Sequence, residues 1–180
     1  MEEMITDLFP TRVYSEKVSN YDTIQQDFDK VEEGIEWQNL WNTHLISDPN
    51  FLDNILPESF DNELKDHVRI FTGREDFRVT ASWMARFEPG QYGVSHQHGH
   101  SDLSGVYYYK TTGDDGNLYF QTPALAATTT VWSTQPNYYD MPPVQGKLLL
   151  FPGYLTHGIH TNVSRHTRIS VSFNITFDRP

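Results

Sequence analysis

The strongest constraint on the fold is an alternation of apolar and polar side chains that begins near residue 78. Between residues 79 and 87 every second residue is apolar, at Val79, Ala81, Trp83, Ala85 and Phe87. Because successive side chains of a strand point to opposite faces of a sheet, this pattern predicts a half-buried strand. Further short apolar or alternating runs occupy 104–109, 117–121, 129–133, 147–151 and 167–177, with Gly, Pro, Asn and Asp clustered between them. Short strands at such spacing predict a sandwich or barrel.

Before residue 78 the apolar residues recur at helical spacing instead. The spaced sets are Ile24, Phe28 and Val31, then Trp37, Leu40, Trp41 and Leu45, then Phe60, Leu64 and Val68. This pattern predicts a mostly helical N-terminal part, residues 1–77, packed on one sheet of a β core formed by residues 78–180. A chain of 180 residues suits one hydrophobic core, so we expect a single domain.

Composition excludes several classes of function. The net charge of −11 leaves no basic field for a nucleic acid or an anionic membrane, so a small anionic co-substrate would need one or two dedicated arginines. Cysteine is absent, so any metal must be held by His, Asp or Glu, and a reducing cytoplasm is compatible with the chain. The first eight residues carry three acids and no base, and no apolar run approaches the ~20 residues that span a bilayer. We expect a cytoplasmic protein without a targeting segment.

The last expected strand has one polar face and one apolar face. The polar face carries Arg168, Ser170, Ser172, Asn174 and Thr176, and the opposite face carries Ile169, Val171, Phe173, Ile175 and Phe177. In an ordinary antiparallel sheet the polar face would be the solvated side. The other interpretation is the wall of a polar pocket, and the strand alone does not decide between the two.

A cluster of histidines favours a metal site. His96 and His98 are two residues apart, so on a strand their imidazoles share a face and can reach one ion. Alone, this pair is more typical of exposed polar residues in a turn than of a metal site. A second segment strengthens it, because a buried strand within 146–151 runs into a Pro-Gly turn and then His157. A third ligand from a distant strand would complete a facial metal site.

Facial Fe(II) sites usually combine two imidazoles with one carboxylate, so an acid is expected nearby. Asp102 is the candidate, and the run H-x-H-x3-D resembles the ligand run of the cupins. Asp102 either binds the metal or orients His96 or His98 through a hydrogen bond. His100 ranks lower, since its use as a ligand with Asp102 would leave almost no loop before the strand at Ser104.

The segment His96 to Tyr108, HQHGHSDLSGVYY, resembles the "HxH…lSGVyY" signature of a prolyl-hydroxylase-like family of putative 2-oxoglutarate/Fe(II) oxygenases. Similar agreement occurs at 7–11, 82–83, 146–157 and 168–174. The resemblance implies a double-stranded β-helix (a cupin-like jelly roll) and a dioxygenase that uses Fe(II), 2-oxoglutarate and O2. The implied reaction hydroxylates a second substrate and releases succinate and CO2. The wider superfamily has Asp or Glu at position 98, so this site has three histidine ligands or recruits Asp102.

The resemblance also implies a binding site for 2-oxoglutarate. Arg168 and Ser170 are similar to the Arg-x-Ser motif that holds the distal carboxylate, by a bidentate pair and a hydroxyl hydrogen bond. Tyr108 resembles a tyrosine that contacts 2-oxoglutarate in prolyl-hydroxylase-like relatives, although an ordinary core position fits it equally well. Ser104 shares the cavity-facing parity of Tyr108. Asn174 continues the Arg168 face and would position substrate or satisfy backbone groups.

Several alternatives stay open from the sequence. Arg165 competes with Arg168, but the polar turn 162–166 favours a solvated arginine there. A cupin-like metalloprotein could use the same histidines without 2-oxoglutarate. The aromatic residues Tyr107–Tyr109, Trp132, Tyr138 and Tyr139 also fit a non-catalytic ligand-binding β-sandwich. A peptidyl residue, a free amino acid, a nucleotide or a small metabolite all remain as substrates, and we expect the loop 123–143 to help select among them. The sequence does not indicate an oligomeric state.

Overall fold

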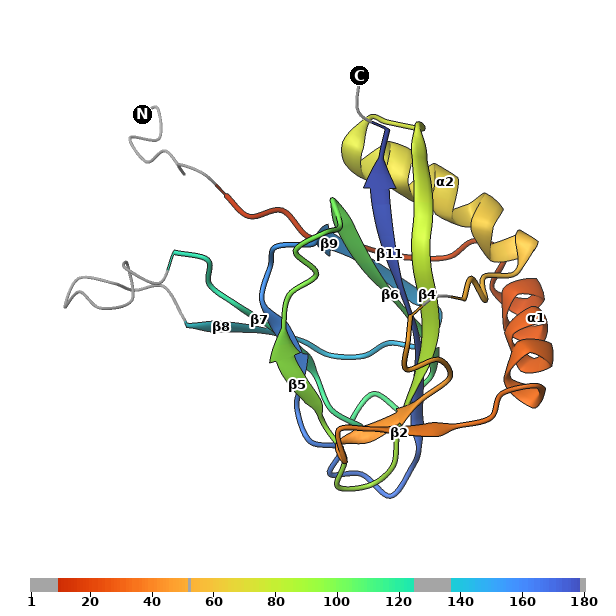
Figure 1. The fold of residues 1–180 in the computed structure, drawn as a ribbon, viewed down its shortest axis with the longest axis vertical. Helices are drawn as coiled ribbons and strands as arrows, with labels where there is room; N and C mark the ends of the chain where they lie inside the picture. The colour runs from red at the N-terminus through yellow and green to blue at the C-terminus, as the bar shows by residue number, and fades with distance from the viewer. Residues whose placement is uncertain (1–9, 52, 125–136, 179–180) are drawn as a thin grey trace, which may run out of the picture.

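The computed structural model describes residues 10–51, 53–124 and 137–178, which form eleven strands and two helices (Figure 1). The helices are α1 (Tyr21–Glu33) and α2 (Glu58–Thr72). The strands are β1 (Tyr14–Lys17), β2 (Gln38–Leu40), β3 (His44–Ile46), β4 (Phe77–Phe87), β5 (Gly93–His96), β6 (Leu103–Lys110), β7 (Leu118–Gln121), β8 (Tyr138–Met141), β9 (Lys147–Pro152), β10 (His157–Ile159) and β11 (Arg168–Phe177).

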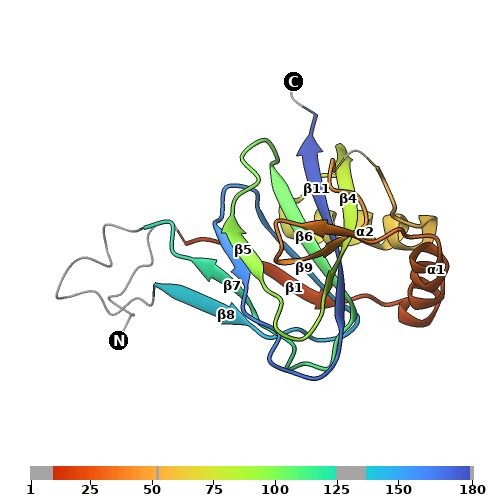
Figure 2. The ribbon, with the colours of Figure 1, turned by 60° about the horizontal axis from the view of Figure 1, so that its bottom comes forward.

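The strands form two antiparallel sheets. The larger sheet has the order β1-β9-β6-β11-β4-β3-β2, and the smaller has the order β5-β10-β7-β8. In Figures 1 and 2 the smaller sheet lies to one side of the larger one, and the chain passes repeatedly between the two. From β4 onward the chain crosses back and forth between these two facing sheets, with β7 and β8 both in the smaller one, and this makes the expected double-stranded β-helix, a jelly roll.

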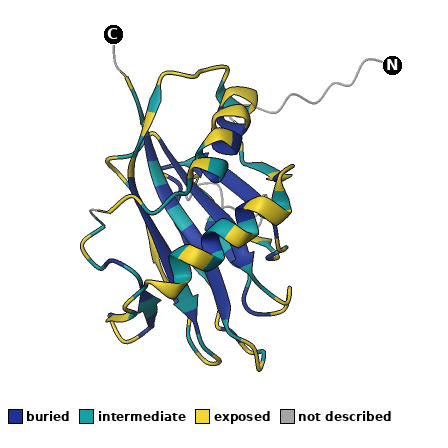
Figure 3. Cartoon of the chain, turned by 90° about the vertical axis from the view of Figure 1, so that its right-hand side faces the viewer, coloured by how far each residue is buried: buried dark blue, intermediate teal, exposed yellow. Residues whose placement is uncertain are grey.

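Helices α1 and α2 cover the outer face of the larger sheet, with their exposed residues outward (Figures 1 and 3). Phe28 of α1 stacks on Tyr107 with ring centroids 5.5 Å apart, and Phe60 of α2 meets Phe173 edge-on at 5.9 Å. Each of these four side chains is fully buried, and burying one such side chain contributes about 1.5–3 kcal/mol. The alternation of β6 and β11 therefore directs one set of side chains to the helices and the other toward the smaller sheet.

The predicted helix over residues 37–45 is wrong. These residues form the β2–β3 hairpin, whose turn has Trp41 at φ 52° and Asn42 at φ 58°, a conformation that ends any helix. Asn39 Oδ1 accepts a hydrogen bond from the Asn42 backbone N–H at 2.8 Å. Pairing of β3 with β4 decides the outcome, because it extends the larger sheet and buries Ile46. With β1 also extended, the N-terminal part is less helical than expected.

Five of the expected strands are confirmed as β4, β6, β7, β9 and β11. The expected strand at 129–133 lies outside the described residues. The segment 123–143 is not all loop, because residues 138–141 form β8. Strands β5 and β10 have only four and three residues, too few to produce a readable period. No helix among the described residues is long and apolar enough to cross a membrane.

Candidate metal centre

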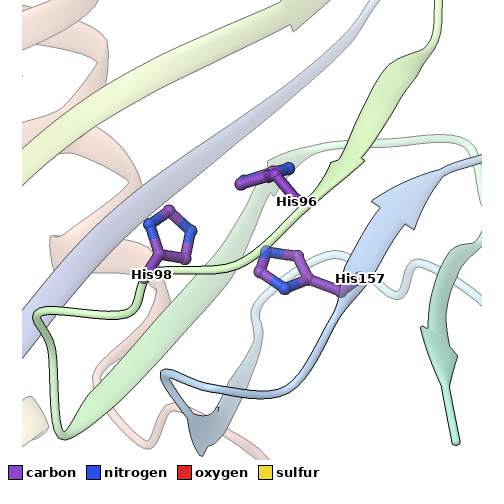
Figure 4. A group of neighbouring side chains, drawn as sticks. All are labelled: His96, His98 and His157. Carbon is purple, nitrogen blue, oxygen red and sulfur yellow. The ribbon is translucent and has the colours of Figure 1, made fainter.

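Three histidines meet between the two sheets. His96 ends β5, His98 follows it in the next loop, and His157 begins β10, whose register pairs it with His96 (Figure 4). One ligand nitrogen from each ring lies within 4.8 Å of the others. Ring centroids are 4.5 Å apart for His96 and His157, and 4.8 Å apart for His96 and His98. Three imidazoles at this spacing can hold one divalent ion on one face.

The Pro-Gly turn before His157 positions the loop that carries His98. The His98 N–H donates to the Gly153 carbonyl oxygen at 2.8 Å, and the Gly153 N–H donates to the Asp102 carbonyl oxygen at 3.2 Å. A Cβ at Gly153 would overlap the Ser101 carbonyl oxygen and lie 2.8 Å from that of His98. Glycine is therefore required for the two segments to touch.

Backbone carbonyls fix the tautomers of two of the rings. His96 Nδ1 lies 2.7 Å from the Val94 oxygen, and His157 Nδ1 lies 2.8 Å from the Leu155 oxygen. Because a carbonyl oxygen only accepts, each Nδ1 carries the proton and each Nε2 keeps a lone pair for an ion.

The electrostatics of the cluster also suit a metal. Burial, and then the neighbouring His96, lower the pKa of His98 to about 4. Burial is the largest cause for His157 too, followed by His96 and His98, and its pKa is lowered to about 3. Imidazoles must be neutral to bind a metal, so these two rings are ready to do so at neutral pH.

The structure places Asp102 away from this group, which corrects its predicted position as a ligand. Its Oδ2 accepts a hydrogen bond from the Phe177 N–H at 2.8 Å, and its own N–H donates to the Ile175 oxygen at 2.9 Å. A turn closed by the Ser101 N–H and the His98 oxygen redirects the chain between His98 and Asp102. In the described ranges the cluster contains histidines only. Asp102 instead holds the end of β11.

Two of the predicted polar residues lie beside the histidines. Ser104 Oγ donates to Asn174 Oδ1 at 2.9 Å, and Asn174 Nδ2 lies 3.4 Å from His98 Nδ1. Ser104 is buried and Asn174 half-buried, and both line the cavity next to the three rings. The polar face of β11 is thus turned into the molecule, which favours the pocket interpretation over the solvated one.

The other predicted polar residues form a buried group on β11 and β6. The Arg168 side chain is fully buried, with its guanidinium 5.1 Å from the Tyr108 ring and 5.5 Å from the Phe87 ring. Its Nη1 donates to the Gly116 carbonyl oxygen. Burial lowers the pKa of Arg168, while Tyr108 and Asp115 oppose that shift. Arg165, by contrast, is exposed in its turn.

Four polar atoms of this group have no hydrogen-bond partner among the described residues: Arg168 Nε and Nη2, Tyr108 OH and Ser170 Oγ. Ser170 and Tyr108 face each other in the β11–β6 register. A buried donor left unpaired costs about 1–3 kcal/mol, so a group of them indicates a missing partner. Two N–H donors of a buried guanidinium and two hydroxyl donors beside it fit a carboxylate, such as the distal carboxylate of 2-oxoglutarate.

A cavity of about 360 Å³ adjoins the three histidines and extends to Phe87, whose ring lies 5.5 Å from the Arg168 guanidinium. No sequence pattern indicated one residue of its wall, His44 of β3, because a lone histidine in a segment with helical spacing is ordinary. His44 is buried and stacks on Phe87 with ring centroids 4.7 Å apart. Burial, and then His96, lower its pKa to about 4.

Comparison with known proteins gives one family and one fold. A family model described as "Putative 2OG-Fe(II) oxygenase" matches residues 81–174, which include all three histidines. No curated protein matches the chain.

The chain is similar to several solved structures. HygX from Streptomyces hygroscopicus, with nickel, 2-oxoglutarate and hygromycin B bound, is 14% identical with a TM-score of 0.67, over 92% of this chain and 83% of that one. A prolyl-4-hydroxylase from Pseudomonas putida is 18% identical with a TM-score of 0.60, over 94% of both chains. The epimerase SnoN from nogalamycin biosynthesis is 9% identical with a TM-score of 0.71, over 93% of this chain and 78% of that one. At such identities the likeness is one of fold, and it confirms the double-stranded β-helix.

Proposed function

This chain belongs to the 2OG-Fe(II) oxygenase family, and we propose that it is an Fe(II)- and 2-oxoglutarate-dependent dioxygenase that hydroxylates a second substrate. One observation carries the proposal. Three clustered histidines line one cavity, and a buried arginine with unpaired donors packs on Phe87 of the same cavity wall.

The proposed ligands of Fe(II) are His96, His98 and His157, bound as neutral imidazoles. Iron, when bound, supplies the oxidising chemistry by activating O2 together with 2-oxoglutarate. The chain contributes orientation, because the carbonyls of Val94 and Leu155 hold the Nδ1–H atoms of His96 and His157. Asn174, held by Ser104, is proposed to steady the His98 ring and the groups bound beside it.

The proposed partners of the distal carboxylate of 2-oxoglutarate are Arg168, Ser170 and Tyr108. Arg168 would donate from Nε and Nη2, and the two hydroxyls would donate from either side. The Gly116 carbonyl already fixes Nη1, so the guanidinium is oriented before the co-substrate arrives. Water is excluded from these atoms, which strengthens each charge-assisted hydrogen bond.

The all-histidine cluster favours a second candidate, a metal-dependent reaction without 2-oxoglutarate. Facial Fe(II) oxygenase sites usually include a carboxylate, and among the described residues none joins these histidines. The unpaired donors around Arg168 argue for 2-oxoglutarate, because a metal-only mechanism leaves them without a partner. We propose hydroxylation as the reaction on the second substrate. Epimerisation is the alternative, because the structurally similar SnoN is an epimerase. A cytoplasmic location remains a prediction.

Anaerobic titration tests the proposal. Fe(II) and then 2-oxoglutarate are added to the folded protein, and the visible metal-to-ligand charge-transfer band is followed. We expect a band that saturates with one 2-oxoglutarate per iron. Iron binding without that band would support the metal-only candidate, and folded protein that binds no iron would contradict both.

A further inference from the structure

The wall of the cavity contains no Asp, Glu, Lys or Arg among residues 10–51, 53–124 and 137–178. Beyond the three proposed ligands it is mainly apolar, with Leu40, Trp41, Ile46, Phe51, Trp83 and Val94 among its members. Burying a charge without a partner is far more costly than burying a neutral polar group. Such a wall therefore selects against a charged group on the part of the second substrate that enters.

Two aromatic residues of this wall have unusual backbones. Trp41 has φ 52° and Phe51 has φ 56°, a left-handed conformation that bulky residues rarely adopt. Strain of this kind costs on the order of 1–3 kcal/mol and is concentrated at ligand-binding positions. Trp41 is 64% exposed although it lines the cavity, so one face of its indole is available to a ring at the mouth.

A hydrogen-bond chain gives His44 a free acceptor. Thr43 Oγ1 donates its only proton to the Leu40 carbonyl oxygen at 3.1 Å. The same oxygen lies 2.9 Å from His44 Nδ1, and with its proton on the Leu40 carbonyl it accepts a hydrogen bond from that nitrogen. In the neutral ring the proton then sits on Nδ1, and Nε2 has a lone pair. Nε2 has no hydrogen-bond partner among the described residues, and the ring lines the cavity.

We propose that the second substrate is a small molecule whose uncharged aromatic ring carries a hydroxyl or N–H group, with the ring against Trp41 and the donor on His44 Nε2. That this ligand is the substrate of an oxygenase rests on the proposed function, whereas its binding does not. In this proposal His44, on β3, positions the substrate through its hydrogen-bond donor. His44 lies outside residues 81–174, the segment that the family model matches.

A matched set of ligands tests this on the metal-free full chain. The probes are 4-cresol (ring and hydroxyl), 4-methylanisole (the same ring without a donor) and tyrosine (the same ring and hydroxyl with two charged groups). Dissociation constants come from ligand-observed NMR titration. We expect 4-cresol to bind at least about fivefold more tightly than 4-methylanisole, the ratio that one net hydrogen bond supports. Tyrosine should bind at least about tenfold more weakly than 4-cresol.

Variants locate the binding. His44→Phe should keep the affinity for 4-methylanisole and abolish the preference for 4-cresol, and His44→Gln, which restores an acceptor, should recover part of it. Trp41→Ala should weaken binding of both neutral probes. Tyr154→Ala, at another well-exposed aromatic residue that lies outside the cavity wall, should weaken binding of neither. Thermal melting confirms that each variant is folded.

Equal or tighter binding of tyrosine, or an unchanged probe ratio in His44→Phe, would overturn the proposal. Failure of the probes in protein that still gives the charge-transfer band would remove this substrate class and leave the oxygenase. Probe binding in protein without that band would remove the oxygenase and leave the ligand site.

Discussion

The backbone N–H of His98 donates to the carbonyl oxygen of Gly153 at 2.8 Å, across 55 positions of the sequence. This bond joins the H-x-H segment to the Pro-Gly turn that precedes His157. The approach is so close that a Cβ at position 153 would overlap the Ser101 carbonyl oxygen. The geometry of the three imidazoles thus depends on a residue that offers no ligand.

Gly153→Ala should weaken metal binding without touching a ligand. The added methyl meets backbone, so the His98 loop must move, and a free energy of unfolding lower by about 1–3 kcal/mol is expected. Fe(II) affinity, measured by anaerobic titration, should fall with it. Gly99→Ala is the control in the same loop, because a Cβ there meets nothing within 4 Å and should change stability by less than about 0.5 kcal/mol. Equal effects of the two changes would count against the argument.

His157→Ala and Asp102→Asn should differ in their effect on Fe(II) affinity, because His157 is a proposed metal ligand and Asp102 is not. Loss of a ligand should reduce Fe(II) affinity by on the order of 100-fold or more, beyond what losing a supporting hydrogen bond costs. Asp102→Asn should leave Fe(II) affinity within about twofold and lower the unfolding free energy by about 1 kcal/mol, because Asp102 bonds the Phe177 N–H. His100→Ala changes an exposed residue of the same run and should alter neither the Fe(II) affinity nor the unfolding free energy. A large loss of iron in Asp102→Asn would restore the acid to the site.

The sequence predicted the β core well because long alternating strands carry a clear period. The ten residues of β11 placed Ile169 and Val171 in the helix-covered core, and Arg168 and Ser170 on the opposite, inward face. The alternation could not show whether that polar face is solvated. Pairing on both sides, with β4 and β6, and the smaller sheet opposite decide it.

Prediction failed where tertiary contacts overrode local spacing. Residues 37, 40, 41 and 45 have helical spacing, yet β3 pairs with the edge of β4 and the turn adopts positive φ. The predicted position of Asp102 beside the histidines was missed for a related reason. A spacing of four residues does not reveal the turn that the structure forms between His98 and Asp102. His44 reaches the cavity only through the same unpredicted hairpin, so no local pattern could have singled it out.

Arg168→Lys should specifically weaken binding of 2-oxoglutarate. Lysine keeps the charge but loses the pair of parallel donors at Nε and Nη2, so a 10- to 100-fold rise in the dissociation constant is expected. The charge-transfer titration measures it at saturating Fe(II), whose own affinity should be unchanged. Arg165→Lys is the matched control, because Arg165 is exposed. Unchanged affinity in Arg168→Lys would remove this arginine from the proposed site.

Tyr108→Phe should change stability and co-substrate affinity in opposite directions. The Tyr108 hydroxyl is buried without a partner, so its removal should leave the free protein equally stable or about 1 kcal/mol more stable. The affinity for 2-oxoglutarate should fall several-fold. Tyr109→Phe is the contrast, since its hydroxyl lies within hydrogen-bond distance of the Asp29 and Glu32 carboxylates and donates its one proton there. Its loss should destabilise the protein without affecting the affinity for 2-oxoglutarate. Destabilisation by Tyr108→Phe would mean that its hydroxyl already has a partner.

The metal-free protein should lose stability as the pH falls from about 6.5 to about 4. Burial lowers the pKa of His44 to about 4, so over this interval the unfolded chain binds more protons than the folded one. At 1.36 kcal/mol per unit, this histidine contributes stability on the order of 3 kcal/mol, complete above pH 6.5 and lost toward pH 4. Urea denaturation at several pH values measures the slope. His44→Phe keeps a ring over Phe87 but cannot bind a proton, so its slope should be shallower, with His98 and His157 supplying what remains. Identical slopes would show that His44 titrates normally in the folded state.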